Sequence, residues 1–222
     1  MSKHTVVLKG REDPVEVGKI VCIGRNYVDH IKELNNERPS APMFFIKPTT
    51  ALQPLTAPIH IPGYSKAARH ELELAVLIGK TLRNCTQEEV YPAIEGYAVA
   101  LDVTLVDVQE KCKQKGHPWE IAKGFDGSCP ISPFVPAAQV PDPQDVLVRM
   151  QVNGELRHNG STRLMIWKIP ELIADASRYF TLEPGDIVLT GTPAGVGSLE
   201  PGDELEMEIE HVGIYHSRVA KG

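Results

Sequence analysis

The chain has no closely spaced cysteines. None of its four cysteines lies in a C-x-x-C pair; they are Cys22, Cys85, Cys112 and Cys129. Zinc knuckles and redox-active dithiols both depend on such close spacing, so neither kind of site is predicted. Because no secretory leader is expected, the four cysteines are predicted to be free, buried thiols rather than two disulfides.

The chain also lacks a run of basic residues and a long apolar segment. It carries 23 Lys and Arg against 29 Asp and Glu, a net charge of −6, which argues against nucleic acid or an anionic membrane as the main partner. Its apolar stretches are strand-sized, far below the roughly 20 residues that span a bilayer. The first residues, Met1 to Thr5, resemble neither a secretory signal nor a transit peptide. We therefore expect a cytoplasmic protein.

The glycine-rich segment 190–197 is not a nucleotide-binding loop. It lacks the Gly-Lys-Ser/Thr ending of a P-loop, and the G-x-G-x-x-G pattern of a dinucleotide site is also missing. A glycine-rich loop that follows a strand can present backbone N–H groups to a carboxylate. The alternative is a wide turn, and the sequence pattern leaves both interpretations open.

What the chain does contain is a set of carboxylates on apolar segments. Glu71 and Glu73 stand two apart among aliphatic residues, so both project from one face of a strand, and Asp102 lies in a second such segment. An unpaired carboxylate is costly to bury, and a divalent cation would remove that cost. Three hard oxygen donors favour Mg²⁺ or Mn²⁺ over Zn²⁺. The alternative is a half-exposed antiparallel strand, which is how we interpret the alternating glutamates of 204–210.

A histidine and a glutamate stand three apart on a predicted helix. His30 and Glu33 fall in the segment 28–34, so their side chains share one helix face. A carboxylate that orients an imidazole makes a general base suited to neutral pH. The polar segment 35–42 that follows is predicted to be a mobile loop, as a lid would require. The alternative is an ordinary surface contact.

Two further polar residues have no role that spacing alone can decide. Lys123 lies between Trp119 and Phe125. It is either a cation desolvated near a substrate anion or a surface lysine whose stem covers apolar atoms. Gln109, seven residues after Asp102, is equally open. Four histidines without ligand spacing receive no role: His117, His158, His211 and His216.

The chain is predicted to form one α+β domain, mainly β. Its 222 residues suffice for one well-buried core, and no linker divides them. Strands or hairpins are expected at 5–17, 19–24, 44–46, 70–78, 97–103, 152–156 and 186–189. Helices are expected at 28–34 with Asn26 as N-cap, at 87–95 with a Thr86–Glu89 capping box and Gly96 as stop, and at 170–180 with one apolar face.

Six motifs occur in an order that matches a known family. They are Gly24-Arg25-Asn26-Tyr27-Val28-Asp29-His30, Phe45-Ile46-Lys47-Pro48, His70-Glu71-Leu72-Glu73, Asp102 with Asp107-Val108-Gln109, the segment 119–123, and the segment 190–197. Each motif is weak alone, but six in order are specific. From about residue 18 onward the chain resembles the fumarylacetoacetate hydrolase family, in its short branch of acylpyruvate hydrolases and oxaloacetate decarboxylases.

The resemblance implies a fold, a metal site and a role for each matched residue. The implied fold is a mixed β-roll or β-sandwich core of the fumarylacetoacetase C-terminal type, with short flanking helices and a lid helix, at 18–222 after a short hairpin segment at 1–17. A homodimer is also implied. By role, the matched residues are metal ligands Glu71, Glu73 and Asp102 for Mg²⁺ or Mn²⁺, lid dyad His30 and Glu33, catalytic cation Lys123, and substrate contacts Arg25, Lys47, Gln109 and Thr192.

The implied activity is hydrolysis of the C–C bond of acylpyruvates through a pyruvate enolate. Oxaloacetate gives the same enolate when it loses CO₂, so one site can serve both substrates. One alternative is the isomerase/decarboxylase of homoprotocatechuate breakdown, and another is a non-catalytic metal-binding scaffold. One position departs from the family, because Val106 stands where an Arg is common. If that Arg contacts the substrate in the family, its contribution to substrate selectivity does not apply to this chain.

Overall fold

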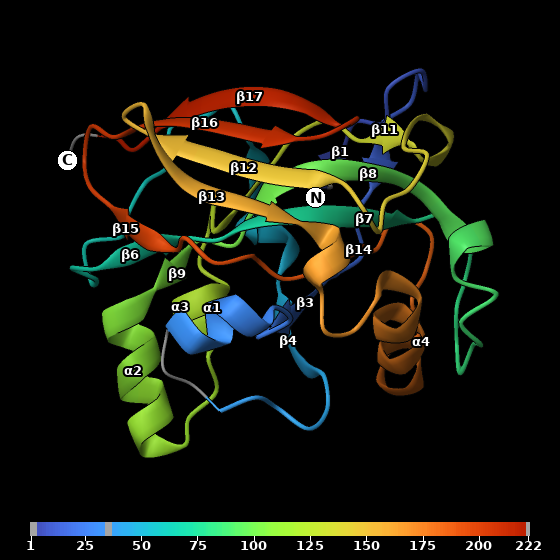
Figure 1. The fold of residues 1–222 in the computed structure, drawn as a ribbon, viewed down its shortest axis with the longest axis horizontal. Coiled ribbons are helices and arrows are strands. Elements are labelled where there is room, and N and C mark those ends of the chain that lie inside the picture. The colour runs from blue at the N-terminus through green and yellow to red at the C-terminus, as the bar shows by residue number, and fades with distance from the viewer. Residues whose placement is uncertain (1–3, 34–36, 221–222) are drawn as a thin grey trace.

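The computed structural model describes residues 4–33 and 37–220. Its centre is an eight-stranded mixed sheet in the order β4-β3-β14-β7-β8-β10-β5, with β11 also paired to β8. A four-stranded antiparallel sheet, β13-β12-β16-β17, packs over it, with β12 against β7 and β16 against β8 (Figure 1). A small sheet, β15-β6-β9, lies beside these layers, and β1 pairs with β2. The architecture is mainly β with short helices, as the sequence predicts.

The strands are short, and most belong to the two large sheets. Those of the eight-stranded sheet are β3 Ile20–Gly24, β4 Met43–Lys47, β5 Leu52–Pro54, β7 Leu72–Ile78, β8 Ile94–Leu101, β10 Cys129–Ile131, β11 Val135–Pro136 and β14 Ile187–Leu189. The remaining strands are β1 Thr5–Val6, β2 Val15–Glu16, β6 Ala68–His70, β9 Thr104–Leu105, β12 Leu147–Val152, β13 Glu155–Ser161, β15 Gly197–Leu199, β16 Glu204–Ile209 and β17 Gly213–Arg218.

The helices lie at the edges of the sheets. They are α1 Val28–Glu33, α2 Val106–Lys115, α3 Glu120–Lys123 and α4 Ile169–Tyr179, with 3₁₀ turns at Thr49–Ala51, Tyr91–Ala93, Ala137–Gln139 and Thr162–Leu164. Helices α2 and α3 contact each other, and both contact β9. In Figure 1 they share one side of the molecule with α1, away from α4. This corner, where β6, β7 and β8 also end, holds the predicted site residues.

Strand β7 explains why the core has two parts. All seven of its residues are buried, which is typical of a strand covered on both faces. Leu72, Leu74, Val76 and Ile78 enter the larger apolar cluster beneath the four-stranded sheet, whereas Ala75 and Leu77 enter a second cluster on the other face. Glu73 is in register with that second face, opposite its leucine neighbours, as alternation predicts.

Several local predictions are confirmed. Asn153 and Gly154 have positive φ angles of 53° and 79°, as a tight two-residue hairpin requires, and they join β12 to β13. Helix α4 buries Leu172, Ile173 and Ala176, although Tyr179 is 63% exposed. All four cysteines are free, three of them buried and Cys85 half-buried. Within the described residues, no helix has the length and apolar character needed to cross a membrane.

The helix predicted at 87–95 is wrong. The capping contact itself forms, since Thr86 N–H donates to Glu89 Oε2 at 2.8 Å. The chain then makes only a turn and a 3₁₀ turn before β8 begins at Ile94. Pro92 cannot donate within a helix. Gly96, predicted as the helix stop, instead pairs with Leu77 of β7.

One predicted strand is divided in two, and one helix was not predicted. The strand predicted at 70–78 breaks at Glu71, between β6 and β7, and α2 occupies Val106–Lys115 without having been foreseen. Of the predicted loop 35–42, residues 37–42 hold neither helix nor strand. Residues 35 and 36, and the last residue of the predicted helix 28–34, lie outside the described residues.

Candidate metal and substrate site

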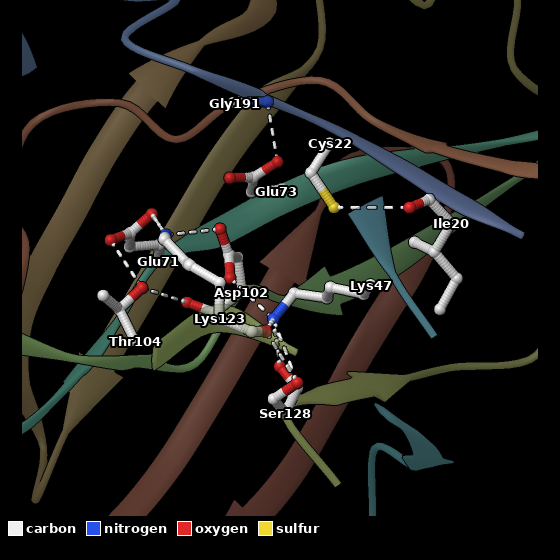
Figure 2. A network of polar contacts seen from close by, with 10 residues as sticks. All are labelled: Ile20, Cys22, Lys47, Glu71, Glu73, Asp102, Thr104, Lys123, Ser128 and Gly191. Carbon is white, nitrogen blue, oxygen red and sulfur yellow. Dashed lines mark hydrogen bonds and ion pairs between the residues drawn. The ribbon is translucent and has the colours of Figure 1, made fainter. Parts of the chain in front are cut away.

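The three predicted carboxylates converge at the ends of neighbouring strands. Glu71 lies in the break between β6 and β7, Glu73 on β7, and Asp102 directly after β8. The backbone N–H of Asp102 donates to the carbonyl of Glu71 at 2.9 Å, which fixes the two segments together. One carboxylate oxygen of each residue lies within 4.8 Å of those of the other two. Figure 2 shows the three side chains turned toward one another.

Burial excludes the half-exposed strand as an explanation. Glu73 and Asp102 are each 1% exposed. Burial raises the pKa of Glu73 well above its ordinary value, and the nearby Asp102 and Glu71 raise it further. Asp102 Oδ1 is buried and accepts no hydrogen bond from the described residues, and its partner is the Lys47 ammonium, 2.9 Å away. Three crowded carboxylates that offer only oxygen donors fit a hard divalent cation, so Glu71, Glu73 and Asp102 are the residues that would hold Mg²⁺ or Mn²⁺.

Lys123 is a buried cation joined to this cluster. It ends α3, and its Nζ donates to Asp102 Oδ2 at 2.6 Å and to Glu71 Oε2 at 2.9 Å (Figure 2). Burial lowers the pKa of Lys123, but attraction to Asp102 and Glu71 outweighs burial and leaves the pKa above its ordinary value. The same attraction holds the pKa of Glu71 below its ordinary value against the effect of burial. Lys123 is therefore a fixed positive charge, and the surface-lysine alternative is wrong.

Lys47 lies behind Asp102. It is fully buried at the end of β4, with Nζ 2.9 Å from Asp102 Oδ1. The same Nζ donates to the carbonyl of Ser128 and to its hydroxyl, both at 3.1 Å, and to the carbonyl of Lys123. These contacts tie Asp102 to the end of α3. Lys47 thus supports the Asp102 carboxylate and the end of α3 that carries Lys123, whereas the family resemblance implied a substrate contact for Lys47.

Helix α1 brings the predicted dyad to the same corner. His30 is 5% exposed, and its Nδ1 lies 3.5 Å from Glu33 Oε2. Within the described residues His30 Nδ1 neither accepts nor donates a hydrogen bond, so its contact with Glu33 is an ion-pair contact. His30 is buried, whereas the Glu33 side chain is 34% exposed, so the general-base role of the pair stays a prediction. His30 is also close enough to Glu71 to help lower the pKa of that carboxyl group.

Asn26 anchors the start of α1 to the rest of the molecule. Its Nδ2 donates to the carbonyls of Thr190 and Trp167 at 2.9 and 3.1 Å, and its Oδ1 accepts from Trp167 N–H at 2.9 Å. The side chain predicted to cap the helix is therefore engaged with distant segments. Arg25, just before it, has a φ of 62°, an uncommon angle for a residue with a side chain. The turn into α1 is held by these tertiary contacts.

A cavity of about 50 Å³ opens beside the carboxylates. The predicted residues that line it are Arg25, His30, Glu71, Gln109 and Lys123. Phe45 and Trp119 form an apolar wall with ring centroids 6.5 Å apart, and Lys123 Nζ lies 5.1 Å from the Phe45 centroid. The cavity is thus polar on the carboxylate side and aromatic on the other.

The glycine-rich segment 190–197 contacts both the carboxylate cluster and the His30–Glu33 pair. Gly191 N–H donates to Glu73 Oε2 at 2.7 Å, and Gly195 N–H donates to both carboxylate oxygens of Glu33 at 3.1 Å. Thr192, predicted to hold a substrate carboxylate, is buried between these two contacts and does not line the cavity. Gly191 has a φ of 93°, and a Cβ there would lie 2.8 Å from Asn26 Cβ, so a larger residue does not fit. The loop thus presents N–H groups to two carboxylates of the chain itself, and its binding of a substrate carboxylate stays a prediction.

Three supporting residues were not predicted from the sequence. Thr104 Oγ1 donates to Glu71 Oε1 at 2.9 Å, and Ser128 accepts from Lys47. His158, to which the sequence assigned no role, is fully buried against His70. Of these, only Thr104 carried a local signal, because it follows Asp102 by two residues and so shares its side of an extended chain.

Comparisons with known proteins show which proteins this chain resembles. The family model described as fumarylacetoacetate (FAA) hydrolase C-terminal matches residues 19–220. The chain is 55% identical over 195 residues to oxaloacetate tautomerase YcgM of Escherichia coli, covering 87% of this chain and 89% of the relative. It is 48% identical over 195 residues to the mitochondrial oxaloacetate tautomerase FAHD1 of Homo sapiens, covering 87% and 88%.

A solved structure of a fumarylpyruvate hydrolase shares the whole fold. That enzyme, from Pseudomonas aeruginosa in complex with Mn²⁺ and pyruvate, is 36% identical with a TM-score of 0.94, covering 100% of this chain and 98% of the other. The fold class predicted from the sequence is confirmed. With the family model spanning nearly all of the described residues, the chain belongs to the fumarylacetoacetate hydrolase family.

Proposed function

We propose that this chain is a Mg²⁺- or Mn²⁺-dependent enzyme that acts on short 2-oxo acids through their enolates. The observation that carries the proposal is the buried Lys123 ammonium, shared between Glu71 and Asp102 beside the His30–Glu33 pair. A divalent cation, when bound, supplies a Lewis acid for negative charge on the 2-oxo oxygen. The protein adds a second positive charge, on Lys123, and a base, the His30–Glu33 pair. The charge stabilises the enolate oxygen, and the base moves the proton when the enolate forms.

The first proposed activity is interconversion of the enol and keto forms of oxaloacetate. Glu33 faces His30 Nδ1, which leaves His30 Nε2 as the nitrogen that takes the C3 proton from the keto form. In the reverse direction the enol hydroxyl first loses its proton to water, and His30 returns a proton to C3 of the enolate. Lys123 stays protonated and stabilises charge on the enolate. The names of the relatives at 55% and 48% identity, both oxaloacetate tautomerases, support this substrate.

The second proposed activity is hydrolysis of acylpyruvates. Here His30 deprotonates water, the resulting hydroxide attacks the distal carbonyl, and C–C cleavage leaves pyruvate enolate beside Lys123. The fumarylpyruvate hydrolase structure that contains pyruvate supports this activity. Decarboxylation of oxaloacetate yields the same enolate and needs no activated water, so we include it as a side reaction.

Two other functions are less well supported. A 2-hydroxyhepta-2,4-diene-1,7-dioate isomerase from Mycobacterium marinum is 35% identical, but this chain covers 76% of that protein. The isomerase alternative would apply the same enolate chemistry to a longer substrate. A non-catalytic scaffold would need the carboxylates only, and the burial of His30 beside Glu71 argues against it.

A substrate screen tests the proposal directly. Purified protein with Mg²⁺ is assayed by ultraviolet absorbance against enol-oxaloacetate, acetylpyruvate and fumarylpyruvate. We expect faster ketonisation of oxaloacetate and cleavage of at least one acylpyruvate, both abolished by EDTA and restored by Mn²⁺. Metal-independent rates on all three substrates, or none above background, would contradict the proposal.

Replacing Lys123 tests the common enolate. Lys123→Met should lower kcat for oxaloacetate and for acylpyruvates by a similar factor of roughly 10²–10³, the usual cost of losing one electrostatic stabiliser. Lys115→Met, at the exposed end of α2, is the matched control. If only one of the two reactions slows in Lys123→Met, the reactions do not share an enolate held by this lysine.

We also propose that the protein is a homodimer, on the basis of its family. Sedimentation velocity at micromolar concentration should give twice the mass of the 222-residue chain. A monomer under those conditions would contradict this prediction.

A further inference from the structure

Two histidines form a buried hydrogen-bonded pair outside the cavity. His70 ends β6 and His158 lies on β13, and both are fully buried. His70 Nδ1 lies 3.0 Å from His158 Nε2, and His158 Nδ1 lies 2.9 Å from the carbonyl oxygen of Ala194. The pair therefore connects the strand that precedes Glu71 to the glycine-rich segment.

The carbonyl at the end of this chain of contacts fixes the direction of both hydrogen bonds. A carbonyl oxygen only accepts, so His158 Nδ1 carries the hydrogen and donates to Ala194. Burial is the main cause that lowers the pKa of His158, to about 4, so its ring is neutral at neutral pH and Nε2 accepts. His70 Nδ1–H is then the donor to His158.

The peptide that His158 holds is the one that binds Glu33. The carbonyl of Ala194 and the N–H of Gly195 belong to a single trans peptide group, whose two polar atoms point in opposite directions. His158 binds the carbonyl side, and Glu33 receives the N–H through both carboxylate oxygens at 3.1 Å. The orientation that His158 imposes on this peptide therefore aims its N–H at Glu33.

The glycine-rich segment packs closely against the backbone of β13. A Cβ at Gly195 would lie 1.9 Å from the carbonyl oxygen of Arg157 and 3.1 Å from His158 Cα. Two residues further along β13 than His158, a Cβ at Gly160 would lie 2.7 Å from Pro193 Cβ of the same glycine-rich segment. Close backbone packing on β13 and the histidine hydrogen bond thus act on the same peptide.

We propose that His158 is a positioning residue for the His30–Glu33 pair. It orients the 194–195 peptide, the peptide holds the Glu33 carboxylate, and Glu33 orients His30. His70 completes the connection by donating to His158 Nε2. This inference rests on the proposed function of the dyad, since a carboxylate without a catalytic partner would have no need of the arrangement.

Two substitutions at His158 separate its two hydrogen bonds. In His158→Asn, the amide N–H₂ occupies the place of Nδ1 and still donates to Ala194, while the bond to His70 is lost. In His158→Gln, the amide reaches the place of Nε2, and the donor to Ala194 is lost. We expect His158→Gln to lower kcat for acylpyruvate hydrolysis roughly 10- to 100-fold, the scale of a small misplacement of a catalytic group. His158→Asn should lose clearly less.

A double-mutant cycle with Glu33→Ala tells positioning from general destabilisation. If His158 acts through Glu33, adding His158→Gln to Glu33→Ala leaves kcat unchanged. Full additivity of the two losses would overturn the proposal. Equal thermal midpoints for His158→Asn and His158→Gln would show that any difference between their rates does not come from folding.

A measurement without substrate keeps the inference independent of the proposed function. The Gly195 amide resonance and its hydrogen-exchange rate report its bond to Glu33, so both should change in Glu33→Ala and in His158→Gln but much less in His158→Asn. An unchanged Gly195 amide in His158→Gln would overturn the proposal. If the amide responds as expected while the wild-type protein shows no activity, the connection stands and the proposed function fails.

Discussion

Glu33→Ala is expected to lower acylpyruvate hydrolysis roughly 10²–10⁴-fold, the range that general-base catalysis supplies. The variant removes the carboxylate that faces His30 Nδ1 at 3.5 Å. Without it, His30 is neither held in one tautomer nor stabilised when it takes a proton. Decarboxylation of oxaloacetate should fall much less, because the carboxylate leaves as CO₂ and no water has to be activated.

The comparison of three reactions in one variant makes this test specific. Enol–keto interconversion needs a base at C3, so it should fall together with hydrolysis, while decarboxylation separates from both. Glu37→Ala, an exposed glutamate in the segment after α1, is the control and should leave all rates unchanged. Equal loss of all three reactions would mean that Glu33 acts through closure of the site. Unchanged hydrolysis in Glu33→Ala would show that the contact between His30 and Glu33 has no catalytic role.

Glu73→Gln is expected to weaken Mn²⁺ binding by more than roughly 100-fold. Loss of a residue that only supports a metal ligand costs up to about 100-fold in metal affinity, and loss of a direct ligand should cost more. The amide keeps the size of the side chain but removes one negative charge from the cluster of Glu71, Glu73 and Asp102. Isothermal titration calorimetry measures the affinity without a substrate. Glu204→Gln, at the exposed start of β16, is the matched control.

The same variant should have the opposite effect on the metal-free protein. Burial, Asp102 and Glu71 raise the pKa of Glu73 in the folded state. A raised pKa favours folding when the group is protonated, and this contribution is lost as the pH rises through the folded pKa. In EDTA, therefore, Glu73→Gln should unfold at a higher temperature than wild type at alkaline pH, with the gap closing as the pH falls toward the ordinary pKa of a glutamate.

Two outcomes would remove this metal site. Unchanged Mn²⁺ affinity in Glu73→Gln would show that the cation binds elsewhere. A metal-free thermal midpoint that is the same for both proteins at every pH would show that Glu73 is not buried among like charges.

Features that repeat over a few residues could be predicted from the sequence. Alternation along β7 separated Glu73 from Leu72 and Leu74. The aliphatic neighbours indicated a buried strand, although a half-exposed strand stayed open until the structure showed the burial of Glu73. The spacing of His30 and Glu33 placed them on one helix face. Such inferences succeed because the geometry of a single strand or helix fixes which side chains point together.

Local signals failed where distant pairing overruled them. The segment 87–95 had a helix cap at Thr86, yet Ile94 joined the pairing with β7 and Pro92 prevented a helix. Asn26 had the character of an N-cap, but Trp167 and Thr190 bind its side chain. In both cases the tertiary partner offers the backbone or side chain a competing set of hydrogen bonds.

By itself, then, the sequence determined that Glu73 projects from an apolar strand and that His30 and Glu33 share one helix face, because each feature depends on spacing within one segment. Only the tertiary structure decided that Lys123 and Lys47 neutralise Asp102, that Gly195 holds Glu33, and that His158 lies behind that peptide. These contacts join residues that are far apart along the chain, and no local period encodes them. Strand register and close backbone packing bring those residues together.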